Sequence, residues 1–254
     1  MQATITNYFN KGIRFDGRTF DKLRPISIQT HVSETAEGSA LVTWGDTKII
    51  AGVKLSVEQP FPDVPDKGNL MVNAELLPLS SPDFESGPPD ARSIELARVV
   101  DRGIREGKAL DLSQMVIEPG KKVWTANVDI CILNHDGNLI DASALAAIVA
   151  LMNTYFPEYD AEHEKVNYKA ITKKRLPVLH IPIAVTVSKI GGKFVVDLTK
   201  EEEELVEARL TITSLENQNL CALQKGGDQG LLVEEIQTMI ELALAKANEI
   251  RKKI

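Results

Sequence analysis

The stretch KKVWTANVDICILNHDGNLIDASALAAIVALMNTYF, residues 121–156, concentrates apolar residues and decides the fold class of the chain. Its first part is an apolar run that reaches Asp136-Gly137, a dipeptide typical of tight turns, so we expect β-strands on both sides of this turn. From Asp141 onward the sequence is apolar nearly all round, which predicts a helix buried in the core. Strand pairs beside a buried helix indicate the α+β class.

The strand-turn-strand pattern recurs three times outside this stretch. The expected turns lie at Gly45-Asp46 within residues 39–57, at Gly191-Gly192 within 181–199, and at 217–219 within 208–224. Two further helices are predicted. One covers residues 92–110, with Asp90 or Ser93 as its N-cap, and one covers 230–254. The second carries an apolar stripe that consists of Leu232, Ile236, Met239, Ala243, Ala247 and Ile250.

Composition is that of an ordinary globular protein. The 254 residues are 43% hydrophobic and 26% charged, with a formal net charge of −7. No apolar run approaches the ~20 residues that a membrane span needs, and the N-terminus has no secretion signal, so we expect no membrane contact and a cytoplasmic location. The polar stretch after Tyr155 favours a connection between two halves. The predicted division is an N-terminal arm (1–23), an N-terminal subdomain (24–155), a connector (156–180) and a C-terminal subdomain (181–254).

Cysteines and histidines give no metal or redox signature, and we predict no cofactor. Cys131 and Cys221 belong to no CxxC motif, and we expect both to be small core residues. No HExxH motif is present. We assign no metal or catalytic role to the histidines, which are His31, His135, His163 and His180.

The first predicted helix carries three arginines on one face. At 100° per residue, Arg98, Arg102 and Arg105 fall within about 60° of one another. The opposite face is formed by Leu96, Ala97, Val100 and Ile104. Guanidinium groups suit bidentate phosphate contacts, but i,i+4 pairs of Asp101 with Arg105 and of Arg102 with Glu106 would also explain the pattern as a solvated face. The acidic balance argues against unspecific nucleic-acid binding and leaves a local basic patch open.

Two other charged segments have simple explanations. The run KEEEELVEARL, residues 200–210, is typical of a solvated acidic turn, because consecutive carboxylates point in different directions. The turn Asp136 to Leu139 has one glycine and no cation, so it does not announce a phosphate site. No GxSxG, Walker A or GxGxxG motif is present, and the residues alone assign no function.

A family resemblance begins at RFDGRTFDKLRP, residues 14–25. The positions Arg14, Asp16-Gly17-Arg18 and Arg24-Pro25 match the RxDGRxxxxxRP opening of the RNase PH family. EGSALVTWGDTKIIAGV, residues 37–53, resembles another segment of that family, and the similarity extends over nearly the whole chain. Judged by residues 88–112 and 116–143, the chain is most similar to the non-catalytic RNase PH-like subunit of the archaeal exosome.

The resemblance implies an RNase PH-like fold, a duplicated β-α-β core (ribosomal protein S5 domain 2-like) with antiparallel and mixed sheets and buried helices. It places an RNase PH-like subdomain on each side of the connector. It also implies a six-membered ring of three heterodimers with a catalytic sister subunit, and cap proteins with S1 and KH or zinc-ribbon domains. Such a ring degrades single-stranded RNA from its 3′ end with inorganic phosphate.

Two departures from the family imply that this chain has no catalytic residue. Catalytic members carry a GSR triplet where this chain reads Gly137-Asn138-Leu139, so leucine replaces the phosphate-binding arginine. An ungapped match places residues 206–210 on the family's GEADM sequence, so Arg209 replaces the essential aspartate. Its RNA-binding residues are expected at Arg98, Arg102 and Arg105. The alternatives are an active exoribonuclease, in which Glu207 or a glutamate within 201–204 substitutes for that aspartate, and a stand-alone RNA-binding module.

Overall fold

The structure, a computed structural model, describes residues 8–9 and 11–254. The first seven residues of the predicted N-terminal arm, and residue 10, lie outside the described part. The strands are β1 (Ile26–Thr30), β2 (Gly38–Trp44), β3 (Thr47–Glu58), β4 (Asn69–Glu75), β5 (Val116–Glu118), β6 (Lys122–Asn134), β7 (Tyr155–Asp160), β8 (Lys165–Arg175), β9 (Ile183–Ile190), β10 (Lys193–Val196), β11 (Ala208–Ser214) and β12 (Leu220–Gly226). The helices are α2 (Ala91–Glu106), α3 (Leu139–Met152), α4 (Lys200–Glu203) and α5 (Val233–Arg251), and a 3-10 turn covers Leu112–Met115.

Three of the four predicted strand pairs are confirmed. The antiparallel pairs are β2 with β3, β9 with β10 and β11 with β12, each joined at the predicted turn. Gly45 takes a φ of +59°, a left-handed conformation that favours glycine and lets Trp44 face Thr47 across the tight turn. The turn residues therefore set the register of these hairpins.

The expected second strand after Asp136-Gly137 is wrong, because this turn joins strand β6 to helix α3. Gly137 has a φ of +80°, and a Cβ at this position would lie 2.3 Å from the carbonyl oxygen of Leu198. Asn138 follows with a φ of 57° and is the N-cap residue of α3. Short apolar runs are ambiguous between strand and helix, and here the long apolar segment that follows the turn starts its helix at once.

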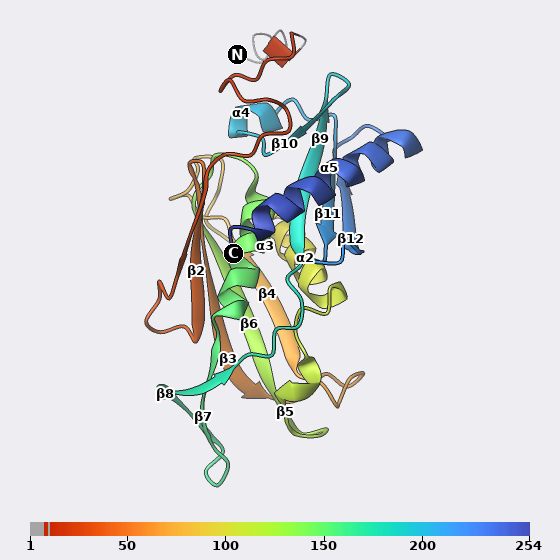
Figure 1. The fold of residues 1–254 in the computed structure, drawn as a ribbon. Helices are drawn as coiled ribbons and strands as arrows, with labels where there is room; N and C mark the ends of the chain where they lie inside the picture. The colour runs from red at the N-terminus through yellow and green to blue at the C-terminus, as the bar shows by residue number, and fades with distance from the viewer. Residues whose placement is uncertain (1–7, 10) are drawn as a thin grey trace.

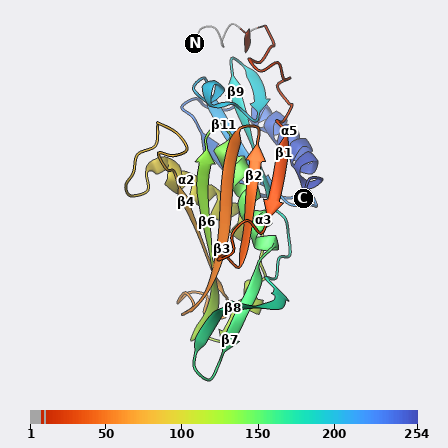
Figure 2. The ribbon, with the colours of Figure 1, turned by 90° about the vertical axis from the view of Figure 1, so that its left-hand side faces the viewer.

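Four layers make up the molecule (Figures 1 and 2). The first sheet has the order β1-β2-β3-β6-β4, with β4 parallel to β6 and β5 paired to β6 off this path, so it is a mixed sheet. Helices α2 and α3 lie between it and the antiparallel second sheet, β10-β9-β11-β12, and α5 covers the outer face of the second sheet. Side chains alternate along β9, so Thr186 faces the inner helices while Val187 faces α5.

The central helix α3 fills the space between the sheets. Six of its apolar side chains are fully buried, namely Ala142, Ala146, Ala147, Ile148, Ala150 and Leu151. The many alanines allow the backbone of the sheet to approach closely: a Cβ at Gly38 would lie 2.6 Å from the carbonyl oxygen of Ala150. The prediction of a core helix is confirmed.

The predicted caps and the C-terminal stripe hold with one exception. Asp90 caps α2, because its carboxylate accepts a hydrogen bond of 2.8 Å from the backbone N–H of Ser93. On α5, Met239, Ala243, Ala247 and Ile250 are buried. Leu232 was expected in the same stripe, but it precedes the helix and is 66% exposed.

The predicted connector contains a hairpin of its own. Strands β7 and β8 pair with each other in a two-stranded sheet that extends beyond the end of the first sheet (Figures 1 and 2). The predicted subdomain boundaries therefore fall beside and inside an ordered element.

Both cysteines differ from the expectation of full burial. Cys131 and Cys221 are half-buried and free. Cys131 lies on the face of β6 that no helix covers, and Cys221 lies on the edge strand β12. Their positions at a sheet surface, which an apolar sequence context does not reveal, explain the difference. None of the described helices combines the length and apolar composition that a membrane span requires.

Candidate functional site

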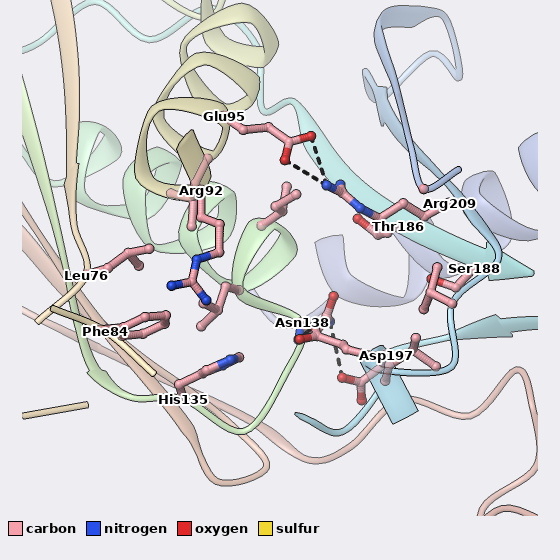
Figure 3. A pocket seen from close by; sticks show the side chains of 17 residues that line it. Leu76, Phe84, Arg92, Glu95, His135, Asn138, Thr186, Ser188, Asp197 and Arg209 are labelled. Carbon is pink, nitrogen blue, oxygen red and sulfur yellow. Dashed lines mark hydrogen bonds and ion pairs between the residues drawn. The ribbon is translucent and has the colours of Figure 1, made fainter. Parts of the chain in front are cut away.

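A cavity of about 370 Å³ lies where the N-terminal half of α2, the β6–α3 turn and the second sheet meet (Figure 3). Its volume is within the range of small-molecule sites. One part of its wall is apolar and consists of Leu76, Phe84, Leu96, Leu139, Ile140, Leu198 and Val206. The polar part consists of Arg92, Glu95, His135, Asn138, Thr186, Ser188, Asp197, Glu203 and Arg209. Both halves of the chain therefore contribute to one cavity.

Arg209, the residue that the sequence comparison by motif predicts at the family's aspartate position, faces this cavity and is held by an ion pair (Figure 3). Its Nη2 lies 2.8 Å from both Oε1 and Oε2 of Glu95 on α2. The other terminal nitrogen, Nη1, is buried without a hydrogen-bond partner in the described residues. Gly226 leaves the space for the guanidinium group, since a Cβ there would lie 2.6 Å from Arg209 Nε. The position thus presents a fixed cation and no free carboxylate.

Two backbone donors of the β6–α3 turn are already paired. The N–H of Asn138 donates to Glu203 Oε1 at 2.8 Å, and the N–H of Gly137 donates to His135 Nδ1 at 3.2 Å. Burial raises the pKa of the Glu203 carboxyl, and the Asn138 N–H opposes this shift. A phosphate at this turn would have to displace these partners, and the side chain of Leu139 offers it no charge.

The arginines of the RxDGRxxxxxRP match are structural residues, a role that was not predicted from the sequence. Asp197 has a fully buried side chain and accepts hydrogen bonds from Arg24 Nη2 at 2.7 Å, Arg18 Nη1 at 2.9 Å and Asn138 Nδ2 at 3.1 Å. Arg24 also donates to the carboxylate of Asp136 at 2.8 Å. These bonds join the N-terminal segment to the strand end and to the turn beside the cavity. The match to RxDGRxxxxxRP was the available signal, but spacing alone does not reveal the partner.

The acidic run differs from the expected solvated turn. Glu202 is buried, and its Oε1 accepts a hydrogen bond of 3.0 Å from Arg14 Nε. Glu203 lines the cavity, and Glu207 Oε1 accepts from the backbone N–H of Gly191 at 2.9 Å. Only part of this run is therefore solvated, because α4 turns two of its carboxylates toward the interior.

His135 lines the cavity, although no metal or catalytic role was predicted for it from the sequence. Its ring stacks on Phe84 with centroids 5.3 Å apart. Burial, with a smaller contribution from the Lys200 charge, lowers the pKa of His135 to about 4, so the ring is neutral at pH 7. Because Nδ1 accepts from Gly137, the proton resides on Nε2. The ring adds no positive charge to the cavity. The described residues contain no cluster of His, Cys, Asp or Glu that would hold a metal ion.

The arginine face of α2 lies outside the cavity. Arg98, Arg102 and Arg105 are all exposed, and the helix buries the opposite side through Leu96, Val100 and Ile104. Arg105 forms the predicted pair with Asp101, at 2.8 Å, and also donates to the carbonyl oxygen of Leu70 at 3.0 Å.

The other predicted pair, Arg102 with Glu106, does not form. Within the described part of the chain, the guanidinium groups of Arg98 and Arg102 have no hydrogen-bond or ion-pair partner. Two cations on this helix are therefore available to a ligand.

Two sheet-and-helix units that share one interior and one cavity define the RNase PH-like class expected from the sequence. Residues 22–157 match domain 1 of the 3′ exoribonuclease family, and residues 180–246 match its domain 2. The chain belongs to this family.

Two relatives and one solved structure are similar to this chain over nearly their whole length. The exosome complex component Rrp42 of Thermococcus gammatolerans is 48% identical over 254 residues, which cover 99% of this chain and 93% of the relative. Rrp42 of Archaeoglobus fulgidus is 50% identical over 242 residues, covering 94% and 90%. A solved chain described as the Archaeoglobus fulgidus exosome with RNA bound to the active site has a TM-score of 0.92 and 47% identity, covering 99% of this chain and 96% of that chain.

Proposed function

We propose that the chain is a non-catalytic subunit of a phosphorolytic exosome ring that degrades RNA from its 3′ end in the cytoplasm. The observation that carries this proposal is the ion pair of Arg209 with Glu95, 2.8 Å long, at the position of the family's essential aspartate. Phosphorolysis needs a bound phosphate, cations around it and a carboxylate that protonates the leaving group or orients a metal. In this cavity the carboxylate position is an arginine with a fixed partner.

The phosphate side of the cavity supports the same proposal. Leu139 stands where catalytic members have arginine, and the nearby N–H groups of Gly137 and Asn138 already donate to His135 and Glu203. His135 is neutral at pH 7 because its pKa is about 4. A phosphate ion at this turn would therefore lose hydration without gaining a cation at position 139 or the N–H groups of Gly137 and Asn138.

RNA contact is assigned to the exposed face of α2. Among the described residues, the guanidinium groups of Arg98 and Arg102 have no partner, and Arg105 is the third candidate on the same helix face. Contacts to backbone phosphates carry no base information, so binding by these arginines is independent of sequence. Three heterodimers with a catalytic RNase PH-like sister, together with cap proteins, complete the proposed ring. The similarity to Rrp42 proteins and to an RNA-bound exosome chain supports this assembly.

An active exoribonuclease remains the alternative, and the contacts of the acidic run weigh against it. Glu202 is committed to Arg14, Glu203 to the Asn138 N–H and Glu207 to the Gly191 N–H. Each carboxylate therefore stabilises the local fold. A stand-alone RNA-binding module is also less supported, because two free arginines and one paired arginine offer few phosphate contacts until a ring multiplies them.

The test measures release of nucleoside diphosphates from single-stranded RNA with inorganic phosphate. The purified chain is assayed alone, the catalytic sister alone and the two together, with a mixture lacking phosphate as the control. We expect the chain alone to be inactive and the mixture to be more active than the sister. Activity of the chain alone, repeated after a second purification, would establish the enzyme alternative.

A further inference from the structure

We propose that strand β8 of the β7–β8 hairpin, with the exposed ring of Tyr168, is a second contact surface for single-stranded RNA. This inference rests on the proposed RNA-binding function and adds a surface separate from the α2 arginines. The hairpin lies at the end of the molecule opposite helix α4 (Figure 1).

The charge of β8 stands out in an acidic chain. Lys165–Arg175 contains five cationic residues and no acidic one, whereas the whole chain has a net charge of −7. All five are exposed. The hairpin also contains four acids, Glu158, Asp160, Glu162 and Glu164, and among the described residues none of them forms an ion pair with a cation of β8. Asp160 accepts from the backbone N–H of His163 at 3.1 Å, and Glu164 pairs with Lys122.

Bulges bring the lysines of β8 out of the regular ladder. Pro157 pairs with Ile171 and Glu158 with Asn167, so one step along β7 corresponds to four steps along β8. A second irregularity lies between Ile171 and Arg175. Lys169 falls in the first interval and Lys173 in the second. Bulges redirect side chains and are frequent at functional sites.

The lysines differ in whether they already have a partner. Lys174 Nζ lies 5.0 Å from the ring centroid of Phe156, and the guanidinium of Arg175 stacks 5.2 Å from that of Tyr155. The ammonium groups of Lys169 and Lys173 have no hydrogen-bond or ion-pair partner among the residues that the structure describes. Lys165 has no such partner in the described residues either, whereas Lys169 and Lys173 are the two that lie in the irregular intervals of the β7–β8 pairing.

An exposed aromatic ring on the same strand as these cations favours RNA over an acidic protein segment. The side chain of Tyr168 is 49% exposed, and Lys54 Nζ lies 4.7 Å from its ring centroid. The ring also borders a groove of about 560 Å³. The charged residues of this groove are Glu58, Lys121, Lys122, Glu164 and Lys165, and Lys122 is paired with Glu164. Cations for the backbone and an aromatic ring for a base are the combination that binds single-stranded nucleic acid without sequence preference.

The test compares RNA affinity of full-length variants by fluorescence anisotropy with a labelled oligoadenylate, using the chain alone and mixed with its sister. Lys169→Glu plus Lys173→Glu is the hairpin variant, and Lys252→Glu plus Lys253→Glu is the control with the same change of charge. We expect the hairpin variant to bind on the order of tenfold more weakly, and its log Kd to depend less on log salt, by a slope of about 1.4, if two phosphate contacts are lost. The control should stay within about twofold.

Tyr168→Ala should weaken binding several-fold with an unchanged salt slope, because stacking releases no counterion.

A variant of α2, Arg98→Glu plus Arg102→Glu, separates this inference from the proposed function. If the α2 variant binds weakly and the hairpin variant matches the control, the hairpin surface is refuted and the function stands. If only the hairpin variant is weak, the surface stands and the assignment to α2 fails. If the hairpin variant binds RNA normally but no longer associates with the sister subunit, the surface binds a protein and the proposal is overturned.

A second measurement uses the unaltered protein and so does not depend on folding of a variant. Bound oligoadenylate should protect Lys169 and Lys173 from acetylation, as measured by mass spectrometry, and should leave Lys252 and Lys253 reactive. Equal reactivity of all four lysines with and without RNA would contradict the proposal.

Discussion

Glu95 and Arg209 form an ion pair across the cavity, with Arg209 Nη2 2.8 Å from each carboxylate oxygen of Glu95. Glu95 comes from α2 and Arg209 from β11, so the pair fastens the helix to the second sheet. Because α2 also carries the exposed arginines, the same contact fixes the orientation of the proposed RNA-binding face. Position 209 is thus part of the packing between the two halves.

Restoring the carboxylate at position 209 should not restore catalysis. We expect the variant Arg209→Asp to release no nucleoside diphosphate, because Leu139 still provides no cation for phosphate. The new carboxylate would face Glu95, so the free energy of unfolding should also fall. Arg209→Leu is the control for loss of the ion pair alone. Phosphorolysis by Arg209→Asp would show that the cation at position 139 is dispensable.

Reversing the charge of α2 should weaken RNA retention. The double variant Arg98→Glu plus Arg102→Glu removes two guanidinium groups that have no partner in the part of the chain that the structure describes. We expect the assembled ring to bind and process RNA less well at an unchanged size. Size-exclusion chromatography and product length measure the two properties. Lys252→Glu plus Lys253→Glu provides the matched charge change. Unaltered degradation by the α2 variant would count against the arginine assignment.

Removing Arg24 should destabilise the chain strongly. Its guanidinium lies 2.7 Å from the buried carboxylate of Asp197, and its loss leaves Arg18 as the one ion-pair partner of this buried charge among the described residues. We expect Arg24→Ala to lower the free energy of unfolding by about 3–5 kcal/mol. Exposed Arg98→Ala should change it by roughly 0.5 kcal/mol or less. Urea denaturation measures both, and similar midpoints for the two variants would refute the structural role of the signature arginine.

Asp141 should make stability fall as the pH rises. Burial raises the pKa of this carboxyl to about 7, opposed by hydrogen bonds from the N–H and Oγ1 of Thr186 at 2.9 and 2.7 Å. Because the folded state holds a proton that the unfolded state has released above about pH 4, this contribution is present below pH 4 and is lost as the pH rises toward 7. Between pH 5 and 8 the loss is about 2–3 kcal/mol.

The variant Asp141→Asn isolates this effect. The amide keeps a partner for Thr186 and does not titrate, so the wild-type stability minus the variant stability should fall between pH 5 and 8. Taking this difference removes the contribution of His135, whose lowered pKa makes stability rise between about pH 4 and 6.5. A difference that stays constant over this range would show that Asp141 is ionised throughout.

Local signals predicted most of the elements. Glycine-containing turns marked three hairpins, Asp90 marked the start of α2, and the apolar run after Asp141 marked the core helix. The strand expected after Asp136-Gly137 failed because turn dipeptides and short apolar runs do not distinguish a hairpin from a strand-to-helix turn. That distinction depends on the close contact of Gly137 with Leu198, which is remote in sequence.

The sequence by itself determined the class of the protein, because residue types at motif positions need no coordinates. For the same reason it was enough to identify Leu139 and Arg209, the two residues from which we infer that the chain is not catalytic. It also placed the three arginines on one face of a helix, since helical periodicity is local. Only the tertiary structure decided which charges are free. Arg209 is bound to Glu95, and Arg24 is bound to Asp197 across 173 residues, whereas Arg98 and Arg102 project into solvent. Whether a charge is paired depends on what the fold brings within about 3 Å of it, and such long-range contacts leave no mark in local spacing.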